Sequence, residues 1–189
     1  IARTITTKPS FDTSNPFFVS LGTNGRSCAT CHGLTEALTF TADHAQKLFD
    51  EAAGLHPLFA AVDGANSPTS DMSTIDARRA NTSLLRTKGL IRVELSLPKK
   101  AEFVIESVED PYKYANTSRV SAYRRPLAST NLRFASTVMW DGRELDKTGN
   151  VQKALRSQVV DAVLGHMQAP QAPSVATVKS IVDFETHLF

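Results

Sequence analysis

Cysteine is scarce in this sequence. The chain has two among its 189 residues, Cys28 and Cys31, and both lie in the segment GTNGRSCATCHG over residues 22–33. Structural zinc usually takes four Cys or His ligands, most often from two such pairs, and a second pair is missing. The remaining histidines show no ligand spacing among themselves: His44, His56, His166 and His187. The scarcity therefore disfavours a zinc site.

Long apolar runs and an excess of one charge are also missing. The longest apolar runs are far too short to span a bilayer, and residues 1–18 lack a charged segment followed by an apolar one. Twenty-one basic and 19 acidic side chains give a formal net charge of +2. We expect no membrane span and no nucleic-acid partner from this balance. A secretory signal, if one existed, has been removed.

The residue after the second cysteine, His32, separates the possible roles of the pair. A thioredoxin-like dithiol opens a helix within a βαβ pattern, which does not surround Cys28 and Cys31. In a c-type cytochrome the two thiols add to the haem vinyl groups, and the histidine that follows becomes the proximal iron ligand. The motif predicts one covalently attached haem c, with a structural or redox cysteine pair as the alternative.

The haem prediction also implies a cellular location. Haem attachment of this kind is completed outside the bacterial cytoplasm, so we expect an exported protein, periplasmic or extracellular. Both thiols would be consumed by thioether bonds, so no disulfide is expected. The length and 41% apolar content are enough for one core. We predict a single c-type haem domain over 1–189, standing alone or as one domain or subunit of a larger multi-haem assembly.

The periodicity of the apolar residues predicts a mainly α fold. Helices are expected over 41–54, beside the haem, over 150–169 after an Asn150 cap, and over 174–189 after a Ser174 cap. Residues 56–81 are predicted to form an ordered loop, because turn formers dominate there. Alternation over 90–97 and 101–108 predicts an inserted β-hairpin. The fold class is a cytochrome c-like haem domain with long ordered loops.

The second axial position of the iron has several candidates: Met72, Met139, Met167, His44, His56, His166 and His187. Each has a plainer interpretation, since methionine often fills cores and a lone helical histidine is often a surface or hydrogen-bonded residue. Context favours Met139, which lies in the apolar segment STVMWDGRE that runs into an Asp-Gly turn. His166 and Met167 are its main rivals, and an open or water-filled site is the remaining possibility.

Two motifs occur in order in the chain, GRSCATCHG and RRPLASTNLRFASTVMWDGRE, followed by a helix and the closing IVDFETHLF. On these motifs the chain resembles a haem domain of the bacterial di-haem cytochrome c peroxidase superfamily. The resemblance implies that Met139, immediately before the Trp140–Arg143 turn, ligates iron together with His32. The family's enzymes carry two haems, whereas this chain has one Cys-x-x-Cys-His. A complete di-haem peroxidase is therefore excluded for this chain alone.

The basic stretch before and within this turn contains candidate haem contacts. A guanidinium binds a carboxylate with two parallel hydrogen bonds, so we expect a haem propionate at one of Arg124, Arg125, Arg133 or Arg143. The alternative for each arginine is a solvated basic surface. Trp140 is either a contact of the haem edge or a core aromatic residue.

The leading functional hypothesis is an electron-transfer protein with His32 and Met139 as axial ligands, which exchanges one electron with a redox partner protein. The partner would be another cytochrome or an oxidoreductase subunit. The alternatives are a peroxidase-type enzyme and a gas-binding module, both with an open distal site. A peroxidase needs a positioned acid or base, and Glu102, Glu106 and Glu109 lie in or after the expected hairpin with no local sign of a pocket.

Overall fold

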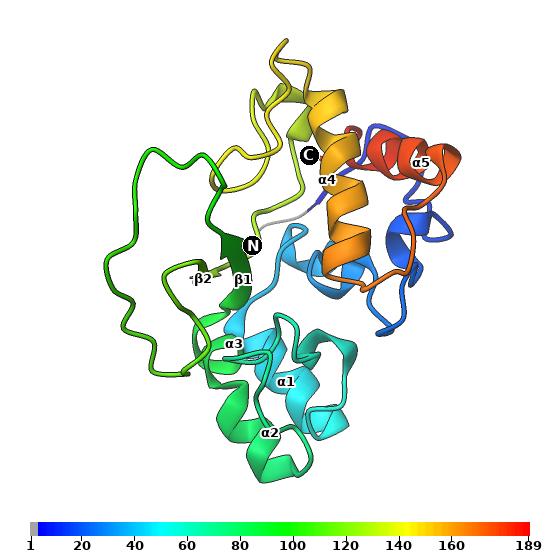
Figure 1. The fold of residues 1–189 in the computed structure, drawn as a ribbon. Coiled ribbons are helices and arrows are strands. Elements are labelled where there is room, and N and C mark those ends of the chain that lie inside the picture. Colours follow the sequence, from blue (N-terminus) through cyan, green and yellow to red (C-terminus); the bar gives the residue numbers. More distant parts are fainter. Residues whose placement is uncertain (1–3) are drawn as a thin grey trace. The chain divides into compact units, whose positions relative to one another are not determined.

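The computed structural model describes residues 4–189 and is mostly helical (Figure 1). By its contacts the chain divides into two compact units. The first unit comprises residues 4–40 and 126–189, and the second comprises residues 41–125. Five α-helices and one two-stranded antiparallel sheet are distributed between them within the described residues. This confirms the coarse prediction of a mainly α chain with a small antiparallel sheet.

The first unit is built on two helices, α4 (Val151–Gly165) and α5 (Val175–Glu185), which cross each other (Figure 1). Both helices begin at the predicted caps. The Asn150 side chain accepts from the Lys153 amide, and Ser174 accepts from the Thr177 amide. These side-chain acceptors satisfy amides that lack a partner within the helix, so the two starts are specified locally.

Four 3-10 helices accompany them in the first unit: η1 (Pro16–Phe18), η2 (Cys28–Thr30), η3 (Leu34–Glu36) and η5 (Leu132–Phe134). The core of this unit gathers side chains from all along its two sequence segments, among them Phe17, Leu38, Val138, Leu155, Val159, Val163, Ile181 and Leu188. The predicted apolar faces of α4 and α5 supply the larger part of it. The remainder comes from η1 and from the segments that follow η3, η5, α4 and α5.

The second unit contains the predicted helix over 41–54 as α1 (Ala42–Ala52), with Thr41 as its N-cap. Helix α1 packs against α3 (Ser83–Lys88), and its place beside a haem stays a prediction. Two helices of this unit were not predicted, α3 and α2 (Ile75–Asn81). They are six and seven residues long, respectively, too short for a 3.6-residue period to show in the sequence. The short helix η4 (Pro57–Phe59) completes this unit.

The hairpin predicted over 90–97 and 101–108 is wrong in its second strand. Strand β1 (Ile91–Ser96) pairs instead with β2 (Arg119–Arg124), in the register Ile91↔Arg124 to Ser96↔Arg119. The alternation over 101–108 does not mark a buried face, since Phe103 and Val104 are 62% and 80% exposed. In contrast, β2 is held by its ladder and by the Tyr123 hydroxyl, which donates to the Asn66 carbonyl at 2.8 Å. A long loop joins the strands (Figure 1).

Two glycines of the first unit provide a matched test of its packing. A Cβ atom at Gly22 would lie 1.9 Å from the carbonyl oxygen of Met167, whereas nothing lies within 4 Å of a Cβ atom at Gly165. We expect Gly22→Ala to lower the free energy of unfolding by about 1–3 kcal/mol, because backbone must move to admit the methyl group. Gly165→Ala should leave it unchanged or raise it by about 0.5–1 kcal/mol. Urea unfolding of both variants measures the difference, and equal midpoints would contradict this packing.

Candidate haem site

The Cys-x-x-Cys-His motif forms one tight turn in the first unit. Helix η2 begins at Cys28, and the amides of Cys31 and His32 both donate to the Cys28 carbonyl, at 3.2 and 3.0 Å. The start of the turn is held by Thr30, whose hydroxyl accepts from the Ser27 amide at 3.0 Å. Both cysteines are half-buried, and neither forms a disulfide. The turn thus presents two thiols and an imidazole from five consecutive residues.

The His32 ring is held through its Nδ1 atom. Nδ1 lies 2.7 Å from the Leu38 carbonyl oxygen and 3.0 Å from the Ser129 hydroxyl. A carbonyl oxygen accepts only, so Nδ1 carries the proton and donates, which leaves the Nε2 lone pair for a metal. Desolvation lowers the pKa of His32, with a smaller contribution from His166, and this favours the neutral ring that metals bind.

A left-handed backbone conformation orients the Leu38 carbonyl towards His32. Ala37 and Leu38 both have positive φ angles, 54° and 53°, in the left-handed region that non-glycine residues seldom adopt. The same carbonyl accepts from the Ser129 amide at 3.1 Å, while the Leu38 side chain is fully buried in the core. Residues 126–129 therefore meet the turn after the motif, and the ring orientation is fixed from both sequence segments of the unit.

The thiol of Cys28 is kept in its neutral form. Burial raises its pKa, and the negative charge of Glu185 on α5 raises it further. A catalytic redox dithiol needs the opposite, a thiolate stabilised by a lowered pKa. The environment of Cys28 therefore disfavours the redox-pair alternative and fits a cysteine that forms a thioether.

Met139 packs against the same core as Cys28, although the two lie far apart in the sequence. Its φ angle is 72°, and its carbonyl accepts from the Gly142 amide at 3.3 Å within the Asp-Gly turn. Trp140, the next residue, is 59% exposed, so it is not a core aromatic residue. Met139 therefore packs against the same core as the first cysteine of the motif. Its role as an iron ligand stays a prediction.

The two main rivals of Met139 follow the end of α4. Met167 is 2% exposed and belongs to the core, and its carbonyl accepts from the Thr23 amide at 3.0 Å. The His166 carbonyl accepts from the Asn24 side-chain amide at 2.8 Å, and His166 is near enough to influence the pKa of His32. Met167 therefore has the contacts of a core residue, whereas His166 remains an alternative ligand.

The other candidate ligands have different surroundings. Met72, His44 and His56 belong to the second unit, where the Met72 carbonyl accepts from the Arg78 guanidinium at 3.0 Å. In the first unit, Nδ1 of His187 lies 2.6 Å from the Asp183 carbonyl one helical turn earlier. The contacts of Met72 and His187 described here do not involve His32, and the ligand roles of all four residues gain no support.

The predicted arginines lie in unlike environments. Arg143 makes a two-pronged ion pair with Asp141, with Nη2 2.6 Å from Oδ2 and Nε 3.0 Å from both oxygens. The Arg133 guanidinium lies 5.8 Å from the centre of the Phe134 ring. Arg124 and Arg125 belong to the second unit, where Arg125 Nε donates to the Lys88 carbonyl at 3.0 Å. Propionate binding by any of them stays a prediction.

Sequence reasoning missed three buried charged residues of the first unit, Arg26, Glu144 and Glu185. Arg26, two residues before Cys28, is 2% exposed, and its Nη1 lies 3.5 Å from the His166 carbonyl. Glu185 is 5% exposed near the end of the chain. The sequence does hold a signal for Glu185, because it follows Ile181 and Val182 at helical spacing and so shares their apolar face. No comparable signal marks Arg26.

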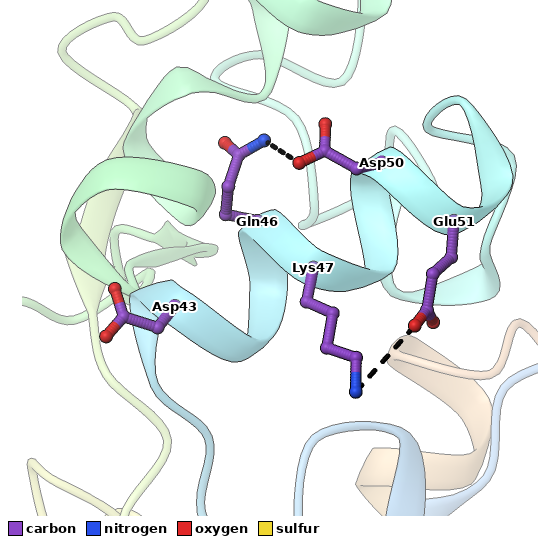
Figure 2. Close-up of a pocket in the computed structure, with 5 residues that line it drawn as sticks. All are labelled: Asp43, Gln46, Lys47, Asp50 and Glu51. Atoms are coloured by element: carbon purple, nitrogen blue, oxygen red, sulfur yellow. Dashed lines mark hydrogen bonds and ion pairs between the residues drawn. The ribbon is translucent and has the colours of Figure 1, made fainter.

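A surface hollow of the second unit is not part of this site. It is lined by Asp43, Gln46, Lys47, Asp50 and Glu51, all from α1 (Figure 2). These side chains engage one another: Gln46 donates to Asp50 at 2.9 Å, and Lys47 lies 3.8 Å from Glu51. They leave no converging set of groups for a ligand.

Residues 4–189 contain no cluster of three or more His, Cys, Asp or Glu side chains that would form a metal site by themselves. No helix among these residues has the length and apolar character needed to cross a membrane. Two thiols beside an imidazole with an available Nε2 are instead the groups that a covalently bound haem requires, so the residues present fit that cofactor.

The contribution of the Arg143–Asp141 ion pair to stability can be tested by its pH dependence. Arg143 lowers the pKa of Asp141 to about 2. The ion pair therefore stabilises the fold fully at pH values above the usual pKa of an aspartate, and this stabilisation is lost as the pH falls towards 2. Because both side chains are partly exposed, we expect Asp141→Asn to cost no more than about 1 kcal/mol at neutral pH and nothing near pH 2. Urea unfolding at the two pH values measures this. An equal cost at both would contradict an ionic contribution.

Comparisons of the whole chain with protein families, with curated proteins and with solved structures found no match.

Proposed function

We propose that the first unit binds one haem c covalently and that the chain exchanges single electrons with a redox partner protein. The observation that carries this proposal is the Nδ1 contact of His32 with the Leu38 carbonyl at 2.7 Å, beside two cysteines that form no disulfide. A fixed, neutral imidazole with a free Nε2 is the form in which histidine serves as an axial ligand.

When bound, haem c supplies a one-electron iron couple whose potential depends on the axial ligands and on burial. The chain's own residues hold and orient it. Cys28 and Cys31 provide the attachment points, and the contact with Leu38 fixes the His32 ring. Met139, at the core that also contacts Cys28, is the proposed second ligand. A sulfur ligand opposite histidine raises the potential and closes the site to substrates, which favours electron transfer over peroxide chemistry.

The exposed Trp140 is the proposed contact of the haem edge. It follows directly after Met139 and is 59% exposed, so its ring borders solvent next to the proposed ligand. An aromatic ring at that place shields the cofactor on one side and is accessible to a partner on the other. The partner is proposed to be another cytochrome or an oxidoreductase subunit in the periplasm or outside the cell.

The likeness to one haem domain of the di-haem cytochrome c peroxidase superfamily belongs to this proposal. It is supported by the order of the Cys-x-x-Cys-His motif and the Trp140–Arg143 turn within one compact unit, where Cys28 and Met139 pack against a common core. The peroxidase alternative gains nothing comparable, because Glu102, Glu106 and Glu109 are exposed residues of the long loop in the second unit.

Covalent attachment is tested by producing the chain in a host that matures c-type cytochromes. We expect haem to stay with the protein after denaturation and extraction with acidified organic solvent, because two thioether bonds hold it. Replacing both cysteines by serine removes those bonds and is the control. Haem that partitions into the organic phase from the unaltered chain would overturn the proposal.

The second ligand is tested by two methionine variants. Met139→Ala should delete the long-wavelength sulfur-to-iron band of the oxidised protein, lower the midpoint potential and admit carbon monoxide or cyanide, while the haem stays attached. Met167→Ala is the matched control. It should keep the band and cost on the order of 2–5 kcal/mol of stability, since Met167 is a buried core residue.

His166→Ala extends this test to the rival ligand. If the Met139 variant keeps its low-spin spectrum while the Met167 or His166 variant loses it, the assignment of Met139 is wrong. An unaltered protein with a high-spin spectrum would instead favour the open site of a peroxidase-type enzyme or gas-binding module.

A further inference from the structure

Helix α5 ends in a buried carboxyl group that the proposed electron transfer does not use. Glu185 is 5% exposed, and its Oε2 atom has no hydrogen-bond partner within the described part of the chain. An unpaired charged carboxylate in such a place is costly, because burial removes its hydration and nothing replaces it. The group is therefore poised between a neutral and a charged form.

The Glu185 carboxyl is close to the proposed haem attachment point. Its charge acts on the Cys28 thiol, so the two side chains are within electrostatic range. The packing agrees with this, since α5 contacts η1 and η1 contacts η2, which begins at Cys28. A charge that reaches the Cys28 sulfur also reaches a haem bonded to that sulfur.

The other titratable groups around Glu185 are differently placed. Those on α4 and α5 and just after them are exposed or partly exposed: Lys153, Arg156, Asp161, His166, Lys179, Asp183 and His187. Asp183 pairs with Lys8. Helix η1 carries none. Near η2 lie Arg26, Cys28, Cys31 and His32, of which the thiols and imidazole would be engaged by haem. Arg26 and Glu185 are the buried charged residues nearest the motif, and Glu144, which contacts Asp161 of α4, is a third buried charged residue of the same unit.

We propose that Glu185 takes up one proton from solvent when the haem centre gains one electron, so that this chain couples electron transfer to proton transfer. The inference rests on the proposed function. The electron comes from a one-electron donor, a reduced redox protein or a chemical reductant, and reduces ferric to ferrous iron. The proton comes from bulk water and forms an O–H bond on the carboxylate. No other bond changes, and oxidation releases both.

Electrostatics sets the direction of the coupling. Burial raises the pKa of Glu185 to about 8, and an added electron nearby raises it further. Below this range the carboxyl is neutral in both redox states, so the potential does not depend on it. As the pH rises through the window just above 8, the oxidised protein loses the proton while the reduced protein keeps it. Reduction then requires proton uptake, and the midpoint potential falls with rising pH.

The test is the midpoint potential of the haem-loaded chain between about pH 6 and about pH 10, across the window set by burial. The unaltered chain should show a flat region, then a fall that approaches a tenfold change in the reduction equilibrium constant per pH unit, about 59 mV for one electron. Glu185→Gln should remove the fall while leaving the spectrum unchanged. Asp183→Asn, which removes an exposed carboxylate of the same helix, should keep it.

Proton uptake is also measured directly on the unaltered chain, so the result does not depend on folding of the variant. Reduction in weakly buffered solution near pH 8–9, where Glu185 titrates, should consume up to one proton per electron, followed with a pH indicator. A carboxyl band should accompany it in the infrared difference spectrum of the two redox states.

Each contrary outcome has its own meaning. An attached, redox-active haem with a potential independent of pH overturns the coupling and leaves the electron-transfer proposal standing. A fall that persists in Glu185→Gln with a native spectrum assigns the proton to another group and also overturns the role of Glu185. A chain that does not retain haem overturns both proposals together.

Discussion

The hydrogen bond from His32 Nδ1 to the Leu38 carbonyl is the constraint on which the site depends. At 2.7 Å it fixes both the orientation of the ring and the nitrogen that carries the proton. The acceptor is itself held in place, since Leu38 is fully buried and its carbonyl also accepts from the Ser129 amide. One residue thus joins the core, the motif and the returning segment after residue 126. A repacking of the core around Leu38 would consequently move the ring.

The sequence predicted those elements whose geometry is set by residues close together in the chain. The expected caps Asn150 and Ser174 begin α4 and α5, because each accepts from an amide three residues ahead. The helix expected over 41–54 begins in the same way after Thr41. The tight turn of the Cys-x-x-Cys-His motif is also held by bonds between near neighbours, and for these elements sequence and structure agree.

Features that depend on distant partners were not predictable from the sequence. Strand β1 has the right pattern, yet nothing local distinguishes 101–108 from β2 as its partner, and the choice depends on bonds such as that of Tyr123 to Asn66. Ser129 likewise looks like any loop serine until the fold places it against His32. Arg26 and Glu185 are residue types that usually lie on the surface, so their burial is a property of the fold.

Desolvation is the common physical cause behind the electrostatics of this unit. It lowers the pKa of His32 and raises those of Cys28 and Glu185, so all three groups are driven toward their neutral forms. A neutral imidazole is the form in which histidine binds a metal, and the neutral Cys28 thiol fits a thioether rather than a redox pair. The same low polarity makes any change of charge at the proposed centre expensive unless a nearby group changes with it. Glu185, neutral or charged within an accessible pH range, is a group that meets that requirement from inside the fold.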